Sequence, residues 1–238
     1  MVETEEKYSP SYFVAQIGHE LRTPLNAIKG FGGILAEEYF GELNSEQKKY
    51  LSRILTSADD LLKIVNQILD WAKLESNEIK LSYEWLNLSH ITTEMKDLFE
   101  ISLKQKNLSL EVDVDSSHQI YGDMGRLRQV LINLVNNAIK FTPEGGKISL
   151  SVIDKSSHII LLVKDTGVGM DEETKKILFD PFKKKDQGKF NTEGTGLGLW
   201  IVQSIMKLHY GYVEVESQVG EGSTFYLYFP KDVCEDDG

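Results

Sequence analysis

A run of apolar residues at alternating steps of four and three dominates the sequence between residues 51 and 72. The run consists of Leu51, Leu55, Ala58, Leu62, Val65, Leu69 and Ala72, widened by Ile54, Leu61 and Ile68. Such a heptad pattern over three repeats predicts one long helix that packs lengthwise against other helices. Its apolar face is wider than a single partner helix covers.

A second helical pattern precedes this one, over about residues 9–38. Its apolar residues at helical spacing are Phe13, Ile17, Leu21, Ile28 and Leu35. Pro24 lies inside the pattern and removes one backbone hydrogen bond, which predicts a bend or a local loosening of the helix. A turn at residues 41–44 then leads to the next helix, with Asn44 or Ser45 as its N-cap.

The two helices are expected to pair as a hairpin that still exposes apolar surface. Dimerisation into a four-helix bundle would cover this surface. The alternative is that the broad face packs only within one chain. The width of the face favours the homodimer.

The heptads stop near residue 75, which predicts a domain boundary between residues 75 and 80. We expect residues 1–75 to form a helical-hairpin domain and residues 78–236 to form a second domain. Helical patterns in the second domain cover residues 91–103, 126–141 and 199–209, and strand patterns cover 108–114, 148–153, 159–164, 212–217 and 223–229. Short turns between consecutive strands indicate a mixed or antiparallel sheet with helices on one face, so the expected fold class is α+β, an α/β sandwich after a helical hairpin.

Composition excludes several classes of function. The chain has 37 acidic and 26 basic side chains in 238 residues and a net charge of −11, which argues against nucleic-acid binding. Its single cysteine, Cys234, cannot form an internal disulfide. No apolar run approaches the ~18 residues of a membrane span, and the acidic start does not resemble a secretory signal. We therefore expect a cytoplasmic segment without membrane contact of its own.

A histidine stands at the start of the motif His-Glu-Leu-Arg-Thr-Pro-Leu, residues 19–25. At about 100° per residue, His19 lies about 200° from both Ile17 and Leu21, so its ring is expected to face solvent. A free imidazole is largely neutral at pH 7 and offers a nucleophilic nitrogen. Glu20 could accept or orient the ring proton. Taken alone, this pair also fits an ordinary surface histidine beside an ordinary glutamate.

Three polar residues share one face of the helix expected over residues 126–141. Asn133, Asn137 and Lys140 are spaced i, i+4 and i+7. Two amide oxygens can help to ligate Mg²⁺ while other ligands come from water and nucleotide phosphates. Lys140 could reach a phosphate as a point charge. The alternative is that these are solvated side chains without a ligand.

Two glycine-rich turns complete the set of candidate motifs. Residues 165–169, Asp-Thr-Gly-Val-Gly, follow an apolar strand, where a carboxylate could accept a hydrogen bond from an exocyclic amine such as that of adenine. Residues 194–198, Gly-Thr-Gly-Leu-Gly, open a helix and could bind an anion through their amides. This second turn lacks the Lys-Ser/Thr ending of a P-loop. Between them, residues 179–182 form either a core-anchored turn or the hinge of a lid.

In order and spacing, these motifs resemble the homology boxes of two-component sensor histidine kinases. The resemblance covers roughly residues 10–230. The H box corresponds to residues 19–25, the N box to 123–143, the G1 box to 165–169, the F box to 179–182 and the G2 box to 194–198. Each box alone is a weak signal, but five boxes in order are a specific one.

The resemblance implies a role for each residue. His19 would accept the γ-phosphoryl group of ATP, with Glu20 as its base, and Thr23 would position water when the protein dephosphorylates its partner. Asn133 and Asn137 would hold Mg²⁺, and Asp165 would select adenine. The residues implied in nucleotide binding are Asn133, Asn137, Lys140, Asp165, Gly167, Gly169, Lys184, Gly194, Thr195, Gly196, Leu197 and Gly198.

The resemblance also implies partners and a reaction sequence. The phosphohistidine would pass its phosphoryl group to an aspartate on a response-regulator receiver domain, and the chain would be the homodimeric catalytic core of a larger receptor. Two alternatives are a gyrase-type ATPase clamp and a non-catalytic dimerisation scaffold. The related ATPases carry a water-activating glutamate where this chain has Asn133, which argues against hydrolysis. Two residues depart from the family pattern: Gly18 replaces a serine and could loosen its helix, and Lys184 replaces an arginine.

Overall fold

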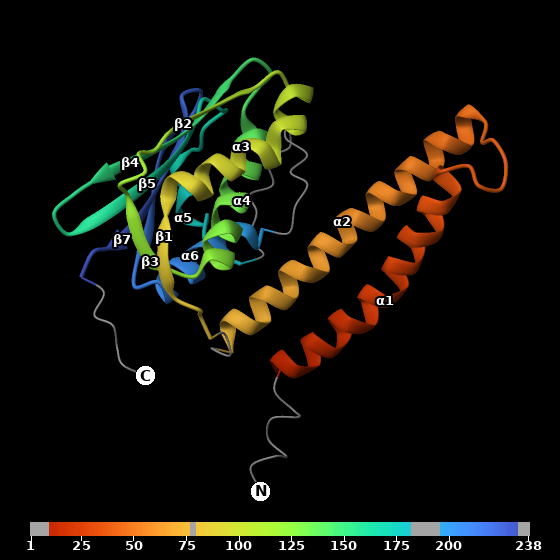
Figure 1. Cartoon of the computed structure of the whole chain (residues 1–238), viewed down its shortest axis with the longest axis horizontal. Coiled ribbons are helices and arrows are strands. Elements are labelled where there is room, and N and C mark those ends of the chain that lie inside the picture. The colour runs from red at the N-terminus through yellow and green to blue at the C-terminus, as the bar shows by residue number, and fades with distance from the viewer. Residues whose placement is uncertain (1–9, 77–79, 182–195, 233–238) are drawn as a thin grey trace, which may run out of the picture. The chain divides into compact units, whose positions relative to one another are not determined.

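A computed structural model of the chain describes residues 10–76, 80–181 and 196–232. These residues form two compact units: residues 10–76 with 196–197, and residues 80–181 with 198–232. The first unit is a helical hairpin, in which α1 (Pro10–Ala36) and α2 (Ser45–Glu75) run side by side (Figure 1). The expected hairpin is confirmed.

The hairpin is held together along one edge of the heptad run. Leu25 of α1 packs with Ala58, Val65 and Leu69 of α2 in a buried cluster. Gly18 is also buried, and a Cβ at this position would lie 2.4 Å from a side-chain atom of Leu69. The missing side chain therefore permits close approach of the two helices. α1 is one continuous helix through residue 18 and through Pro24, so neither residue ends it, and the bend expected at Pro24 stays a prediction.

The turn between the helices ends in a capping box. Asn44 is the N-cap of α2: its Oδ1 accepts from the Gln47 N–H at 2.9 Å, and the Asn44 N–H donates to Gln47 Oε1 at 2.8 Å. Two of the amides without an intrahelical partner at this helix start are thereby satisfied. Of the two N-caps that the sequence left open, the structure selects Asn44.

The second unit contains a five-stranded mixed sheet. Its elements are β1 (Glu84–Asn87), α3 (Leu88–Gln105), β2 (Ser109–Asp113), β3 (Gln119–Gly122), α4 (Met124–Phe141), β4 (Lys147–Asp154), β5 (His158–Asp165), α5 (Glu172–Lys176), α6 (Gly198–Leu208), β6 (Tyr212–Gln218) and β7 (Gly222–Pro230). The strand order is β2-β4-β5-β7-β6. Only the β2–β4 pair is parallel; the other neighbours are antiparallel.

Helices α3, α4 and α6 cover one face of this sheet (Figure 1). Alternate residues of the central strands point into the core and are buried, as in Ile159, Leu161 and Val163 of β5. The helices bury their apolar stripes against them, for example Val130 and Leu134 of α4. This arrangement confirms the expected α+β fold with a mixed sheet and helices.

Three elements of the second unit were not expected from the sequence. β1 and β3 form a separate two-stranded antiparallel ribbon, with Glu84 opposite Gly122 and Asn87 opposite Gln119. Each strand has only four residues, which is too short for a clear periodic pattern. The five-residue helix α5 was missed for the same reason.

Among residues 10–76, 80–181 and 196–232, no helix is long and apolar enough to cross a membrane.

Candidate functional site

The hairpin presents its histidine to solvent. His19, Glu20 and Thr23 are all exposed on α1. The Thr23 hydroxyl donates to the His19 carbonyl oxygen at 3.3 Å, and Gln16 Nε2 donates to Glu20 Oε1 at 3.3 Å. Arg22 Nη2 donates to Asn66 Oδ1 of α2 at 2.7 Å, which ties this turn of α1 to its neighbour. The imidazole is therefore accessible on an anchored helix, as its helical position predicts.

Asn133, Asn137 and Lys140 share one face of α4, as their spacing predicts. Asn133 and Asn137 are half-buried and Lys140 is exposed, while the opposite face of the helix packs into the core. Lys140 Nζ lies 5.1 Å from the ring centroid of Phe141. α4 therefore carries two amides and one cation along one side, beside a buried apolar face that fixes its rotation.

Lys106, which is far from α4 in the sequence, donates hydrogen bonds to the C-terminal end of this helix. Lys106 Nζ donates to the carbonyl oxygens of Ile139 and Lys140 at 2.6 and 2.8 Å. The last carbonyls of a helix lack intrahelical partners, and a cation there also interacts favourably with the helix dipole. Sequence reasoning missed Lys106 because nothing near residue 106 shows that it meets a helix end 34 residues later.

The carboxyl group of Asp165 is buried at the end of β5, with 6% of the residue exposed. Its Oδ1 accepts from the Gly167 N–H at 2.7 Å. Burial raises the pKa of Asp165, and backbone hydrogen bonds from Gly167 and Ser223 oppose that rise. An acceptor held in this way is positioned before any ligand arrives. It fits the expected recognition of an exocyclic amine.

The turn after β5 requires glycine at two positions. Gly169 has φ +65°, and a Cβ there would lie 1.9 Å from the Gln218 carbonyl oxygen. A Cβ at Gly167 would lie 2.7 Å from the Phe141 carbonyl oxygen, so this turn also adjoins the end of α4. The Val168 N–H donates to that same Phe141 oxygen at 3.1 Å. The first glycine turn and α4 are thus fixed to one another.

The start of α6 lies against the middle of α4, at Asn133. A Cβ at Gly198 would lie 3.4 Å from Asn133 Oδ1, so the backbone here faces the asparagine amide. Gly196 just before it has φ +77°, and Leu197 is fully buried. The remaining predicted residues Lys184, Gly194 and Thr195, with Phe182 of the F box, lie outside the described residues. The start of α6 at Gly198 and the first glycine turn therefore both adjoin α4, the former at Asn133 and the latter at Phe141.

Sequence reasoning also missed part of the β6–β7 turn. Gly222 has φ +96°, and a Cβ there would lie 2.0 Å from the Asp165 carbonyl oxygen. The Ser217 hydroxyl accepts from the Met170 N–H at 2.9 Å, and the Gly220 N–H donates to the Val168 carbonyl oxygen at 2.8 Å. The sequence shows these residues only as a hairpin turn. Their role in supporting the turn after Asp165 depends on the pairing of β5 with β7.

Fold and site together define a class of protein. The second unit is a helix-backed mixed sheet whose glycine turns and asparagine-bearing helix suit a nucleotide. Residues 122–233 match the family model for the histidine kinase-, DNA gyrase B- and HSP90-like ATPases. Residues 11–77 match the model for the His Kinase A phospho-acceptor domain. The chain thus joins a phospho-acceptor hairpin to an ATPase-type nucleotide-binding domain.

Comparison with individual proteins agrees with this class. The chain is 34% identical over 223 residues to the circadian input-output histidine kinase CikA of Synechococcus elongatus, covering 92% of this chain and 30% of that protein. It is similar in structure to full-length ShkA in complex with AMPPNP, with a TM-score of 0.78, 29% identity and coverage of 93% and 46% of the two chains. The catalytic domain of histidine kinase ThkA gives a TM-score of 0.55 and 34% identity, covering 63% of this chain and 99% of that one.

The chain belongs to the sensor histidine kinase family and carries its phospho-acceptor and catalytic domains. It spans less than half the length of the first curated relatives that it matches.

Proposed function

We propose that the chain autophosphorylates His19 from ATP and passes the phosphoryl group to an aspartate of a response-regulator receiver domain. In this proposal residues 1–75 form the dimerisation and phospho-acceptor domain, and residues 78–236 bind ATP. The proposal is carried by the presence of two features in one chain. His19 exposes an imidazole on a phospho-acceptor hairpin, and the residue that faces the start of α6 is an asparagine and not a carboxylate.

Nucleotide binding is assigned to the residues gathered around α4. Asp165 would accept a hydrogen bond from the adenine amine, and Lys140, with Lys184, would contact phosphate. Gly167, Gly169, Gly194, Thr195, Gly196, Leu197 and Gly198 would supply backbone close to the ligand. Each role is carried over from the family pattern and agrees with the burial and contacts of those residues that the structure describes.

The amides of α4 suit Mg²⁺ as a nucleotide-bound ion. Asn133 and Asn137 would contribute oxygen ligands, and Mg²⁺ would neutralise charge on the transferring phosphoryl group. Among residues 10–76, 80–181 and 196–232, no group of three or more His, Cys, Asp or Glu side chains could hold a metal ion. Two neutral amides fit an ion that takes its other ligands from phosphate and water.

The transfer step needs a nucleophile and a place for one proton. A ring nitrogen of His19 would attack the γ-phosphorus, forming a P–N bond as the P–O bond to ADP breaks. The ring proton would pass to Glu20, whose carboxylate is exposed on the same turn of α1. In the reverse role, water positioned by Thr23 would hydrolyse the aspartyl phosphate of the regulator and release inorganic phosphate.

A gyrase-type ATPase clamp is the alternative within the same fold. Hydrolysis needs a general base that activates water. Asn133 is an amide and cannot accept a proton, and its place facing Gly198 leaves no carboxylate at that position. This favours transfer to histidine over hydrolysis.

The proposed reaction can be tested by incubating the full chain with γ-labelled ATP and Mg²⁺. We expect the label to become bound to the protein, and chelation with excess EDTA to reduce labelling by about 100-fold or more, because charge on the phosphoryl group is then not neutralised. Stoichiometric release of free phosphate without labelled protein would instead support the ATPase clamp. No binding of nucleotide at all would support the non-catalytic scaffold.

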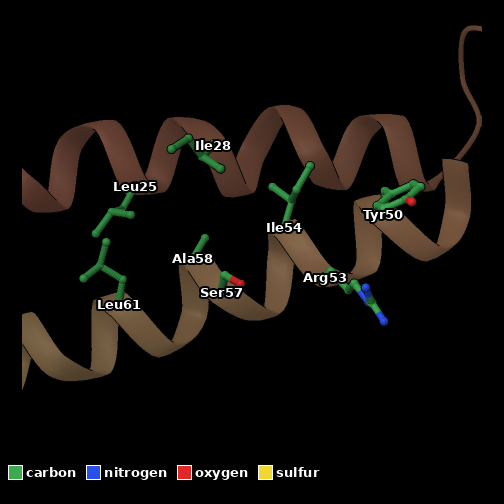
Figure 2. A pocket seen from close by; sticks show the side chains of 8 residues that line it. All are labelled: Leu25, Ile28, Tyr50, Arg53, Ile54, Ser57, Ala58 and Leu61. Carbon is green, nitrogen blue, oxygen red and sulfur yellow. The ribbon is translucent and has the colours of Figure 1, made fainter.

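Dimerisation is assigned to the open side of the hairpin. Leu25, Ile28, Ile54, Ala58 and Leu61 line an apolar groove of about 380 Å³ there, with Tyr50, Arg53 and Ser57 (Figure 2). Ile28, Ile54 and Leu61 remain 44, 52 and 45% exposed in the single chain. A second hairpin packed on this groove would bury them in a four-helix bundle.

Substituting Leu61→Glu is expected to convert the chain from a dimer to a monomer at micromolar concentration. A carboxylate buried in an apolar four-helix core without a partner costs several kcal/mol, which is more than ~100-fold in affinity. Light scattering coupled to size exclusion measures the mass. Ser52→Glu is a matched control, because it lies about 180° around α2 from Leu61 and follows Lys48 by one turn. A Leu61→Glu variant that remains dimeric would contradict the assigned interface.

A further inference from the structure

His209 is a buried histidine that none of the proposed chemical steps uses. It directly follows α6 and is 1% exposed. Its Nδ1 lies 2.8 Å from the Ile205 carbonyl oxygen, which can only accept, so Nδ1 carries the proton. Its Nε2 is therefore free to accept, and the Asp123 N–H donates to it at 2.9 Å. Burial lowers the pKa of His209, in agreement with a neutral ring.

The donor of this bond, the Asp123 N–H, lies at the start of the asparagine-bearing helix. Asp123 is the N-cap of α4, and its Oδ1 accepts from the Arg126 N–H at 3.0 Å. Gly122 leaves room for the imidazole, because a Cβ there would lie 2.8 Å from a ring carbon of His209. The end of α6 and the beginning of α4 are therefore joined by a direct hydrogen bond in a close-packed junction.

The same two helices meet again where α6 begins, beside the middle of α4. Gly198 opens α6 opposite Asn133 of α4. At a rise of ~1.5 Å per residue, both the path from Asp123 to Asn133 and the path from Gly198 to His209 are about 15–17 Å long. The helices thus run antiparallel, and the two contacts lie at the two ends of α6. A shift of α6 along its axis at the His209 end must appear at Gly198, because a helix is stiff along its axis.

The first residues of the second unit form hydrogen bonds to this junction. The Ser82 N–H donates to Asp123 Oδ2 at 2.9 Å, and the Tyr83 hydroxyl donates to the Leu208 carbonyl oxygen. The Tyr83 and His209 rings lie edge to face with centroids 5.7 Å apart. Residues 82 and 83 follow the domain boundary directly, so the incoming chain contacts the N-cap of α4 and the end of α6 together.

We propose that His209 is a positioning residue for the nucleotide site: by accepting the Asp123 N–H it holds α6 in one axial register on α4 and keeps Gly198 opposite Asn133. This inference rests on the proposed nucleotide site. Its ligand is ATP, bound about three helical turns away, and His209 itself touches no reacting atom.

Two amide substitutions separate the hydrogen bond from general packing. Glutamine can place an oxygen where Nε2 lies, whereas the shorter asparagine reaches only the Nδ1 position. In the full chain, we expect His209→Asn to raise the dissociation constant for AMPPNP by about tenfold and His209→Gln to restore it to within about threefold of the wild type. Leu110→Ala on the edge strand β2 is the stability control, since it should lower the unfolding temperature without this loss of affinity.

A measurement on the unmodified chain tests the same link in reverse. Coupling between two sites is reciprocal, so AMPPNP should slow hydrogen exchange of the Asp123 amide by about tenfold while the Leu110 amide changes little. Equal affinity in the wild type and His209→Asn would overturn the inference, as would an unchanged Asp123 exchange rate at saturating AMPPNP. Absence of AMPPNP binding to the wild type would instead refute the proposed function.

Discussion

We expect His19→Gln to abolish the transfer of label from γ-labelled ATP to the chain. Glutamine has a delocalised amide nitrogen and offers no nucleophile, so at least about 1000-fold of the labelling rate should be lost. The hairpin should remain folded, because His19 is exposed and glutamine is at least as good a helix former as histidine. AMPPNP affinity, which depends on the other unit, should stay within about twofold of the wild type.

A second histidine gives the matched control for this experiment. His90 is exposed on α3 and belongs to none of the proposed machinery. His90→Gln should label at the wild-type rate, which would show that removing a surface histidine is not itself harmful. Persistent labelling of the His19→Gln chain would count decisively against the assignment of His19 as the phospho-acceptor.

The second large effect is expected at the buried carboxylate of the nucleotide site. Asp165→Asn should weaken AMPPNP binding by about 10- to 100-fold, because a hydrogen bond to a charged acceptor contributes about 1.5–3 kcal/mol. Calorimetric titration measures this loss. Asp113→Asn, at an exposed carboxylate on β2, should bind AMPPNP as the wild type does.

The stability of the Asp165→Asn chain provides an independent check. Because burial raises the pKa of Asp165, its contribution to stability is present below the ordinary carboxyl pKa of about 4 and is lost as the pH rises through the raised pKa. At neutral pH the ionised group is therefore a cost to the unliganded fold. Asp165→Asn should unfold at the same temperature or higher at neutral pH. A large drop in that temperature would attribute the lost affinity to misfolding.

Periodic patterns predicted the large elements correctly. The heptad run of α2 and the apolar stripe of α4 are long enough for their helical periodicity to exclude the two-residue periodicity of a strand. β1 and β3 have four residues each, and their pairing of Glu84 with Gly122 spans 38 positions. A pairing of that kind carries no local signature. Gly18 shows the same limit, because only the approach of Leu69 reveals why a side chain is absent there.

The candidate site divides in the same way. Residue types and spacing pointed to His19, to the two asparagines and to Asp165, because each chemical role demands a particular functional group. The supporting residues Lys106, Gly222 and His209 were not found. Their roles lie in which helix end or strand turn they meet, and those neighbours are 33 to 86 positions away in the sequence.

The order of motifs along the chain therefore determined the family and led to the proposal of His19 as the phospho-acceptor, since functional groups and helical periodicity are local properties. Only the tertiary structure decided how α4 and α6 are held, which asparagine faces Gly198 and how the turn after Asp165 is supported. Those features arise from packing between segments distant in sequence, where one close contact or one hydrogen bond selects the geometry.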